Sequence, residues 1–293
     1  MTDYGYVETA SIVWMVIGLF VFLVVPVALS LIWIIKKKER VTTILVGAAA
    51  FILFALILEK PIQNVLLFPT AMGLSDHAIS IFMNSHPVLL AFMVGLFPGV
   101  FEETGRLIAY KTVLKKRTNK ETSISYGIGH GGIEVIAILG LTYVNYIAYA
   151  VMINTGTFQT LVDQLMAQAP GQIGQVDQMV SLLTTFSCGK VMLDVVERIF
   201  AVMFHIGASV LVFYACRDKG KFWLYPLAIV IHTVTDFVGG LVIFNVISIS
   251  DWGMEFIVAI IGIVTIFGSY LLLYKKDNKT VAIGARFNTI CKK

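Results

Sequence analysis

The chain has 293 residues, of which 58% are hydrophobic and only 14% are charged. Soluble domains carry about 25% charged residues, so the composition excludes a soluble enzyme and predicts an integral membrane protein. The apolar segments are continuous and do not alternate, which is typical of membrane helices and excludes a barrel. The net charge of +4 comes from basic residues beside the apolar runs. We therefore expect a lipid bilayer as the partner, and no nucleic acid.

Seven apolar runs are long enough to cross a bilayer. They cover residues 9–35, 41–58, 88–110, 123–153, 191–216, 222–246 and 254–274. Short polar breaks separate most of them, which favours one all-α domain over residues 1–293, a polytopic membrane helix bundle. The polar residues described below define a catalytic-like core at residues 88–246.

The basic residues predict the orientation of the bundle. All but four of the 22 lysines and arginines follow the first, third, fifth and seventh runs. The exceptions are Lys60, Arg106, Lys190 and Arg198. Because basic loops stay in the cytoplasm, we expect a multi-pass protein of the cell membrane with its N-terminus outside and its C-terminus cytoplasmic.

Two breaks on the outer side are long. Residues 59–87 contain Pro61 and Pro69, and we expect a loop that dips into the membrane interface. Residues 154–189 contain two amphipathic pieces, 158–168 and 176–186, separated by Pro170-Gly171. Two alternatives stay open for this second break, a lid of short interfacial helices and an inert ordered loop.

Ionisable side chains occur inside four of the runs. A charged residue in a bilayer costs roughly 2.5–3.5 kcal/mol on insertion scales, so such residues face the bundle interior and usually have a function. At 1.5 Å per residue, the two adjacent glutamates and the three histidines among them lie roughly 10–18 Å in from the basic side. They are Glu102, Glu103 and Arg106; His130 and Glu134; Asp194, Arg198 and His205; and His232 and Asp236.

These residues repeat at a spacing of four, which places them on one face of each helix. The pairs are Glu102 with Arg106, His130 with Glu134, and His232 with Asp236. We therefore expect Arg106 to face Glu102. The alternative to a functional site is a polar network that only pairs helices.

Glycines and a proline stand beside the ionisable groups. Gly127, Gly129, Gly131 and Gly132 surround His130, where they allow close helix packing or leave room for a substrate chain. Pro98-Gly99 precedes the glutamate pair and predicts either a local opening or an ordinary bend.

A carboxylate and a histidine on adjacent helices can hold and deprotonate a water molecule, while further donors stabilise an oxyanion. Such a set hydrolyses a peptide bond without a serine or cysteine nucleophile. The same groups offer the ligands that zinc prefers. A divalent metal such as zinc, bound by His130, Glu134, His205 and His232, is therefore the alternative cofactor prediction, although no His-Glu-x-x-His pattern occurs.

At these residues the chain resembles the YhfC-type bacterial intramembrane proteases, within the superfamily related to CAAX proteases and PrsW. The resemblance runs from Val88 to Gly240. Its motifs are Glu102-Glu103-x-x-Arg106, Tyr126-x-x-x-His130, Glu197-Arg198 followed by His205, and His232-x-x-x-Asp236. The Glu–Arg spacing is one residue shorter than in CAAX proteases. His205 has no counterpart in the three-motif pattern, which keeps the metal alternative open.

The resemblance implies an intramembrane endopeptidase acting on a membrane protein or a lipidated peptide near the cytoplasmic half of the bilayer. It implies that Glu102 and His130 activate water, with Glu103 and Arg106 in support. It places His232 and Asp236 at the oxyanion.

Two other functions remain open. Intramembrane His, Glu and Asp also form proton relays in transporters, although the sequence lacks the internal repeat that many carriers show. A non-catalytic scaffold subunit is the other alternative. The sequence carries no signal for a cleavage motif or an oligomeric state.

Overall fold

The computed structural model describes residues 4–168 and 173–277, and within these ranges every regular element is helical. Seven helical segments there are long and apolar enough to span a membrane, which confirms the predicted all-α bundle. They are α1 (Thr9–Lys37); α2 (Val41–Phe51) with η1 (Ile52–Glu59) and α3 (Lys60–Leu67); α5 (Pro87–Lys111); α6 (Glu121–Val135) with η3 (Ile136–Gly140) and α7 (Leu141–Asn154); α10 (Cys188–Arg217); α11 (Leu224–Ile243); and α12 (Asp251–Ser269) with η5 (Tyr270–Tyr274).

The second span is longer than predicted. The sequence predicts its end at Leu58, but the helix continues through η1, which is π-helical, into α3 and reaches Leu67. Pro61 stands in the first turn of α3, directly after the π-helical segment η1. Glu59 therefore lies inside a membrane span and not in a loop. Only η2 (Pro69–Met72) and α4 (Ala78–Asn84) remain of the predicted loop structure.

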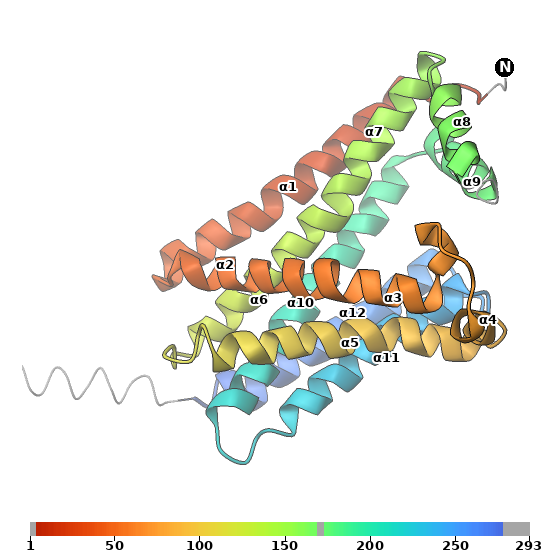
Figure 1. Cartoon of the computed structure of the whole chain (residues 1–293). Helices are drawn as coiled ribbons and strands as arrows, with labels where there is room; N and C mark the ends of the chain where they lie inside the picture. The colour runs from red at the N-terminus through yellow and green to blue at the C-terminus, as the bar shows by residue number, and fades with distance from the viewer. Residues whose placement is uncertain (1–3, 169–172, 278–293) are drawn as a thin grey trace, which may run out of the picture.

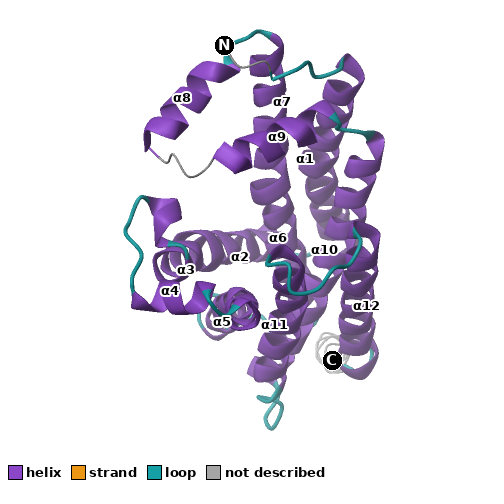
Figure 2. Cartoon of the chain, turned by 90° about the vertical axis from the view of Figure 1, so that its right-hand side faces the viewer, coloured by secondary structure: helices purple, strands orange, loops and turns teal. Residues whose placement is uncertain are grey.

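The spans form two groups that diverge toward one end of the molecule. In Figure 1, α1 runs beside α7, while α2–α3 runs beside α5 at a clear angle to them. Figure 2 shows the same divergence, with α5 seen almost end-on beside the upright α7. Within the bundle α5 packs on α11, and α10 packs on both α6 and α12.

The two groups meet where α2 crosses α6, and glycines make this contact possible. A Cβ atom on Gly129 would overlap the carbonyl oxygen of Ile44, and one on Gly47 would overlap that of Tyr126. On another face of α6, a Cβ on Gly127 would lie 2.6 Å from Ile206 Cα. The glycines at 127 and 129 beside His130 thus serve close helix packing.

Pro98 neither breaks nor opens α5, which is continuous from Pro87 to Lys111. Because proline has no N–H, the carbonyl of Val94 one turn earlier loses its usual helical partner. Gln63 of α3 donates its Nε2 hydrogen to this oxygen at 3.3 Å. The proline therefore creates a hydrogen-bond site that ties α3 to α5.

One end of the bundle carries the basic loops, residues 38–40, 112–120, 218–223 and 275–277, and is called the basic end below. These loops contact one another there. Arg217 Nη1 donates to Thr118 O at 3.2 Å and to Asp277 Oδ2 at 2.5 Å, and Asn119 donates to Glu39. By the positive-inside rule, we expect the basic end to be the cytoplasmic side.

The far end carries α4, α8 (Phe158–Gln168) and α9 (Ile173–Thr184). Helix α8 has the predicted bounds, and α9 begins before the predicted residue 176. The predicted break at Pro170-Gly171 lies outside the described residues. Buried apolar side chains, among them Phe158, Val176 and Leu183, pack α8 and α9 onto the outer parts of α1 and α7.

Candidate active site

Three carboxylate–imidazole pairs lie side by side at the centre of the bundle. Each joins two different helices, so that α5, α6, α10 and α11 all contribute. The pairs are Glu102 Oε2 with His130 Nε2 at 2.9 Å, Glu103 Oε1 with His232 Nδ1 at 3.0 Å, and Glu134 Oε2 with His205 Nε2 at 2.6 Å. The structure thus brings together the ionisable groups that the sequence places on separate spans.

Helix α5 serves two of these pairs because its two glutamates are adjacent. Neighbouring residues on an α-helix point about 100° apart. Glu102 therefore reaches α6, and Glu103 reaches α11. Both side chains are buried, as are the three histidines.

Arg106 does not face Glu102, so this prediction is wrong. Its Nε lies 3.3 Å from Glu103 Oε2. Nη1 donates to His205 O at 2.8 Å and to Ser209 Oγ at 2.9 Å. A spacing of three and a spacing of four both allow a contact along a helix, and the acceptors on α10 draw the guanidinium to the Glu103 side.

Arg106 also fixes the tautomer of His205. A guanidinium only donates hydrogen bonds, so His205 Nδ1, 3.1 Å from Arg106 Nη2, is the acceptor. The ring hydrogen is therefore on Nε2, which lies 2.6 Å from Glu134 Oε2. Glu134 also accepts from Arg198 Nη1 at 3.0 Å, and Arg198 pairs with its neighbour Glu197.

His130 has one ring nitrogen without a partner. Nε2 meets Glu102, whereas Nδ1 is buried and forms no hydrogen bond with any described residue. The ring packs against Phe51 and His205, with ring centroids 5.3 and 4.9 Å away. A buried imidazole nitrogen without a partner has capacity for a water molecule or a metal ion.

Asp236 and Asp194 lie at the margin of the cluster or outside it. Asp236 Oδ2 is 3.5 Å from His232 Nε2, one turn away on α11, and is partly exposed. Asp194 instead accepts from Tyr143 Oη at 2.7 Å and pairs with Lys190 at 2.5 Å. It therefore has a separate, structural set of partners.

A cavity of about 340 Å³ adjoins the cluster and is lined by Glu102, Glu134, His205, His232 and Asp236. Glu59, which the sequence predicts to lie in a loop, also lines this cavity.

Glu59 is fully buried, and its carboxylate has Lys60 Nζ at 3.4 Å but no hydrogen-bond partner among the described residues. A sequence signal for Glu59 exists. Gly47, Phe51, Ala55 and Glu59 recur every four residues and form one buried face of the second span.

A metal ion fits part of this cluster. Glu102, His130 and His205 each offer one ligand atom, and the three atoms lie within 4.8 Å of one another. Ligands around a tetrahedral zinc ion stand roughly 3.4 Å apart, so modest side-chain rotations reach that spacing. The group shares His130 and His205 with the predicted ligands and has Glu102 in place of Glu134 and His232.

The charge of the cavity also suits a cation. Buried charges need compensation, and the carboxylates that line the cavity outnumber its basic groups. The carboxylates are Glu59, Glu102, Glu134, Glu197 and Asp236, and the basic groups are Lys60, Arg198, His205 and His232.

The fold and these contacts define a multi-pass membrane protein with a carboxylate–imidazole centre inside its helix bundle. The chain belongs to the YhfC intramembrane metalloprotease family, whose model matches residues 20–262. It is 30% identical over 230 residues, 78% of this chain and 83% of the relative, to the uncharacterized membrane protein YhfC of Bacillus subtilis (strain 168). No solved structure shows significant similarity to the chain. The family confirms the YhfC part of the predicted resemblance, while the wider superfamily placement stays a prediction.

Proposed function

We propose that the protein is an intramembrane endopeptidase that hydrolyses a peptide bond of a membrane protein or lipidated peptide with a water molecule activated by Glu102 and His130. The observation that carries this proposal is the buried contact of 2.9 Å between these two side chains, on neighbouring helices beside a cavity. The motif likeness to glutamic intramembrane proteases supports the same assignment.

In the proposed reaction Glu102 is the general base. It takes a proton from the water molecule while the water oxygen bonds to the scissile carbonyl carbon and the carbonyl electron pair moves onto its oxygen. Protonated Glu102 then gives this proton to the leaving nitrogen as the C–N bond breaks. His130 holds the water against Glu102.

His232 is placed to stabilise the oxyanion. Its Nδ1 is held by Glu103, and its Nε2 has Asp236 at 3.5 Å, beyond a good hydrogen bond. An imidazolium between two carboxylates presents a hydrogen at Nε2, where an oxyanion accepts it. Arg106 is a positioning residue, because it reaches the reaction only through Glu103 and His205.

We further propose that the site binds a divalent metal such as zinc as a cofactor. Glu102, His130 and His205 would hold it, and when bound it would supply a Lewis acid that activates a coordinated water. The unpartnered Nδ1 of His130 and the acidic lining support this assignment. His205 would have to give up the contact of its Nδ1 with Arg106 to coordinate the metal, because its Nε2 faces Glu134.

The test compares the chain termini of the membrane proteins in cells that express the wild type, Glu102→Gln, His130→Gln or a control variant. The control is Glu8→Gln, because Glu8 is exposed at the start of α1. We expect new termini within membrane segments for the wild type and the control, and their loss in the other two variants. Unchanged termini in Glu102→Gln would reject the endopeptidase and favour the scaffold or transporter.

Metal content is measured on the purified protein, with His86→Ala as the exposed control for His130→Ala. Stoichiometric zinc in the wild type and the control, lost in His130→Ala, supports the metal. Metal-free protein whose cleavage resists chelators would leave Glu102 and His130 to act alone.

A further inference from the structure

The residues on the basic-end side of the candidate site form a seal. On each of the four helices that carry the site, the residue one or two turns nearer the basic end is buried and belongs to one hydrophobic cluster. These residues are Tyr110, Tyr126, Phe213 and Ala228. The rings of Tyr110 and Tyr126 lie 4.9 Å apart, and those of Tyr110 and Phe213 lie 5.5 Å apart. Close-packed aromatic rings leave no path for a polypeptide in this direction.

On the same four helices, the residues on the other side of the site line the cavity. They are Pro98, Ile138, Ala201 and Gly239, each one or two turns nearer the far end. Exposure increases along the cavity in this direction. The Glu102 side chain at the site is 7% exposed, that of Asp236 is 37% exposed, and that of Lys60 is 50% exposed, whereas Glu59 beside Lys60 is buried. The cavity is therefore open at its far-end side.

The helix arrangement explains why the cavity opens there. At the basic end, α2 is held on α6 by the contacts of Gly47 and Gly129. Toward the far end, α3 packs on α4 and α5, whereas α7 packs on α1, α8 and α9. The two groups of helices thus separate, as Figure 1 shows, and the cavity lies between them.

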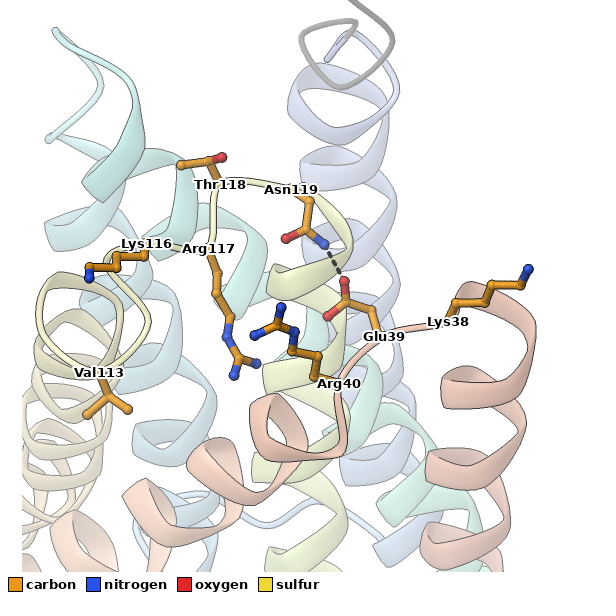
Figure 3. Close-up of a pocket in the computed structure, with 8 residues that line it drawn as sticks. All are labelled: Lys38, Glu39, Arg40, Val113, Lys116, Arg117, Thr118 and Asn119. Carbon is orange, nitrogen blue, oxygen red and sulfur yellow. Dashed lines mark hydrogen bonds between the residues drawn. The ribbon is translucent and has the colours of Figure 1, made fainter. Parts of the chain in front are cut away.

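The basic end has its own pocket of about 690 Å³, which does not lead to the site. Its lining comes from residues 38–40, 113 and 116–119, and none of these residues lines the cavity. Figure 3 shows the guanidinium groups of Arg40 and Arg117 inside it, and the hydrogen bond between Asn119 and Glu39. The sealing cluster around Tyr110 and Tyr126 lies between this pocket and His130 along the helices.

Resting on the proposed function, we infer that the substrate reaches the active site from the outer side of the membrane, through the cavity past Glu59 and Asp236. The substrates are therefore peptide segments that lie at the outer membrane surface or enter the bilayer from it. The buried carboxylate of Glu59 on this route has Lys60 Nζ at 3.4 Å but no hydrogen-bond partner among the described residues, which favours a segment that brings hydrogen-bond donors. This route differs from the access near the cytoplasmic half that the sequence resemblance implies.

The test uses cysteine labelling in a variant whose native cysteines, Cys188, Cys216 and Cys291, are replaced by serine. Gly239→Cys places a thiol in the cavity, where an added Cβ would meet only Met254 Cε at 3.7 Å. Ile243→Cys places one at the cavity opening, where the native side chain is 70% exposed. Lys116→Cys, in the basic-end pocket, is the matched control.

Intact cells are treated with a membrane-impermeant, positively charged methanethiosulfonate. We expect the reagent to label both cavity cysteines in intact cells. The cysteine of Lys116→Cys should be labelled only after the membrane is permeabilised. Cavity cysteines that react only after permeabilisation would overturn the proposed route. Because labelling does not depend on cleavage, labelling from outside without any proteolysis would reject the endopeptidase and leave the route standing.

Discussion

Charged side chains gather in two regions of this molecule, the buried centre and the basic end. At the centre, Glu103 and Arg106 are 0% exposed and 3.3 Å apart. At the basic end, Lys38, Arg40 and Lys116 are exposed, and water solvates their charges. The same kinds of groups therefore meet opposite conditions within one helix bundle.

The difference shows which charges the fold depends on. Removing one member of a buried ion pair leaves the other charge without compensation, which costs about 3–5 kcal/mol. An exposed charge interacts with its neighbours by only about 0–1 kcal/mol. The centre is thus both the part that would perform chemistry and a part on which stability depends, whereas the basic end mainly sets orientation.

The largest expected effect on stability is at Arg106. Arg106→Met keeps much of the side-chain volume but removes the guanidinium beside Glu103 Oε2, which leaves Glu103 with only its contact to His232 among the described residues. We expect the free energy of unfolding to fall by about 3–5 kcal/mol. Thermal unfolding in detergent measures this change. Arg40→Met at the basic end is the control, with an expected change below about 1 kcal/mol. Equal effects of the two substitutions would contradict the comparison.

The next effect tests the packing that encloses the centre. In Gly129→Ala the new methyl group collides with the carbonyl of Ile44, and overpacking of this kind costs about 1–3 kcal/mol. Gly268→Ala on α12 is the matched control, because nothing lies within 4 Å of its added Cβ. We expect Gly129→Ala to unfold at a lower temperature than Gly268→Ala, and the opposite order would show that α2 and α6 separate easily.

Glu59 should respond in opposite ways in two measurements. Glu59→Gln removes a buried charge without a hydrogen-bond partner, so we expect the free energy of unfolding to rise by about 0.5–2 kcal/mol, as at functional sites that trade stability for activity. We expect cleavage to fall in the same variant. A loss of both stability and cleavage would give Glu59 a purely structural role. Glu8→Gln, at an exposed position, should change neither.

The smallest effect is expected at the basic-end pocket. Lys116→Gln removes one exposed charge, so the free energy of unfolding should change by less than about 1 kcal/mol. Thermal unfolding at low and high salt measures it, since salt screens exposed charges. A loss as large as that of Arg106→Met would mean that this pocket also contains a charge on which the fold depends.

Much of the fold follows from the sequence because a helix that crosses a membrane needs a long apolar run. Long apolar runs and the positions of basic residues predict the seven spans, and the spacing of four predicts which polar residues share a helix face. The convergence of Glu102, His130, His205 and His232 follows from the cost of exposing them to lipid. The roles proposed for them remain to be tested by experiment.

Two features of the site differ from the prediction, each for its own reason. Arg106 has Glu102 and Glu103 equally within reach along α5, and only His205 and Ser209 of α10 decide between them. Glu59 is not predicted as a residue of the second span because Glu59-Lys60-Pro61 is typical of a helix end. The π-helical turn of η1 lets the helix continue, and π-helical turns are frequent at functional sites.

Pro98 has a mechanical consequence. The Val94 oxygen that it frees is bound by Gln63, so α3 and α5 are fastened together beside the opening of the cavity. These two helices should move as one rigid wall. A widening that admits a polypeptide would then come from the opposite wall, where α10 and the α6–α7 span stand.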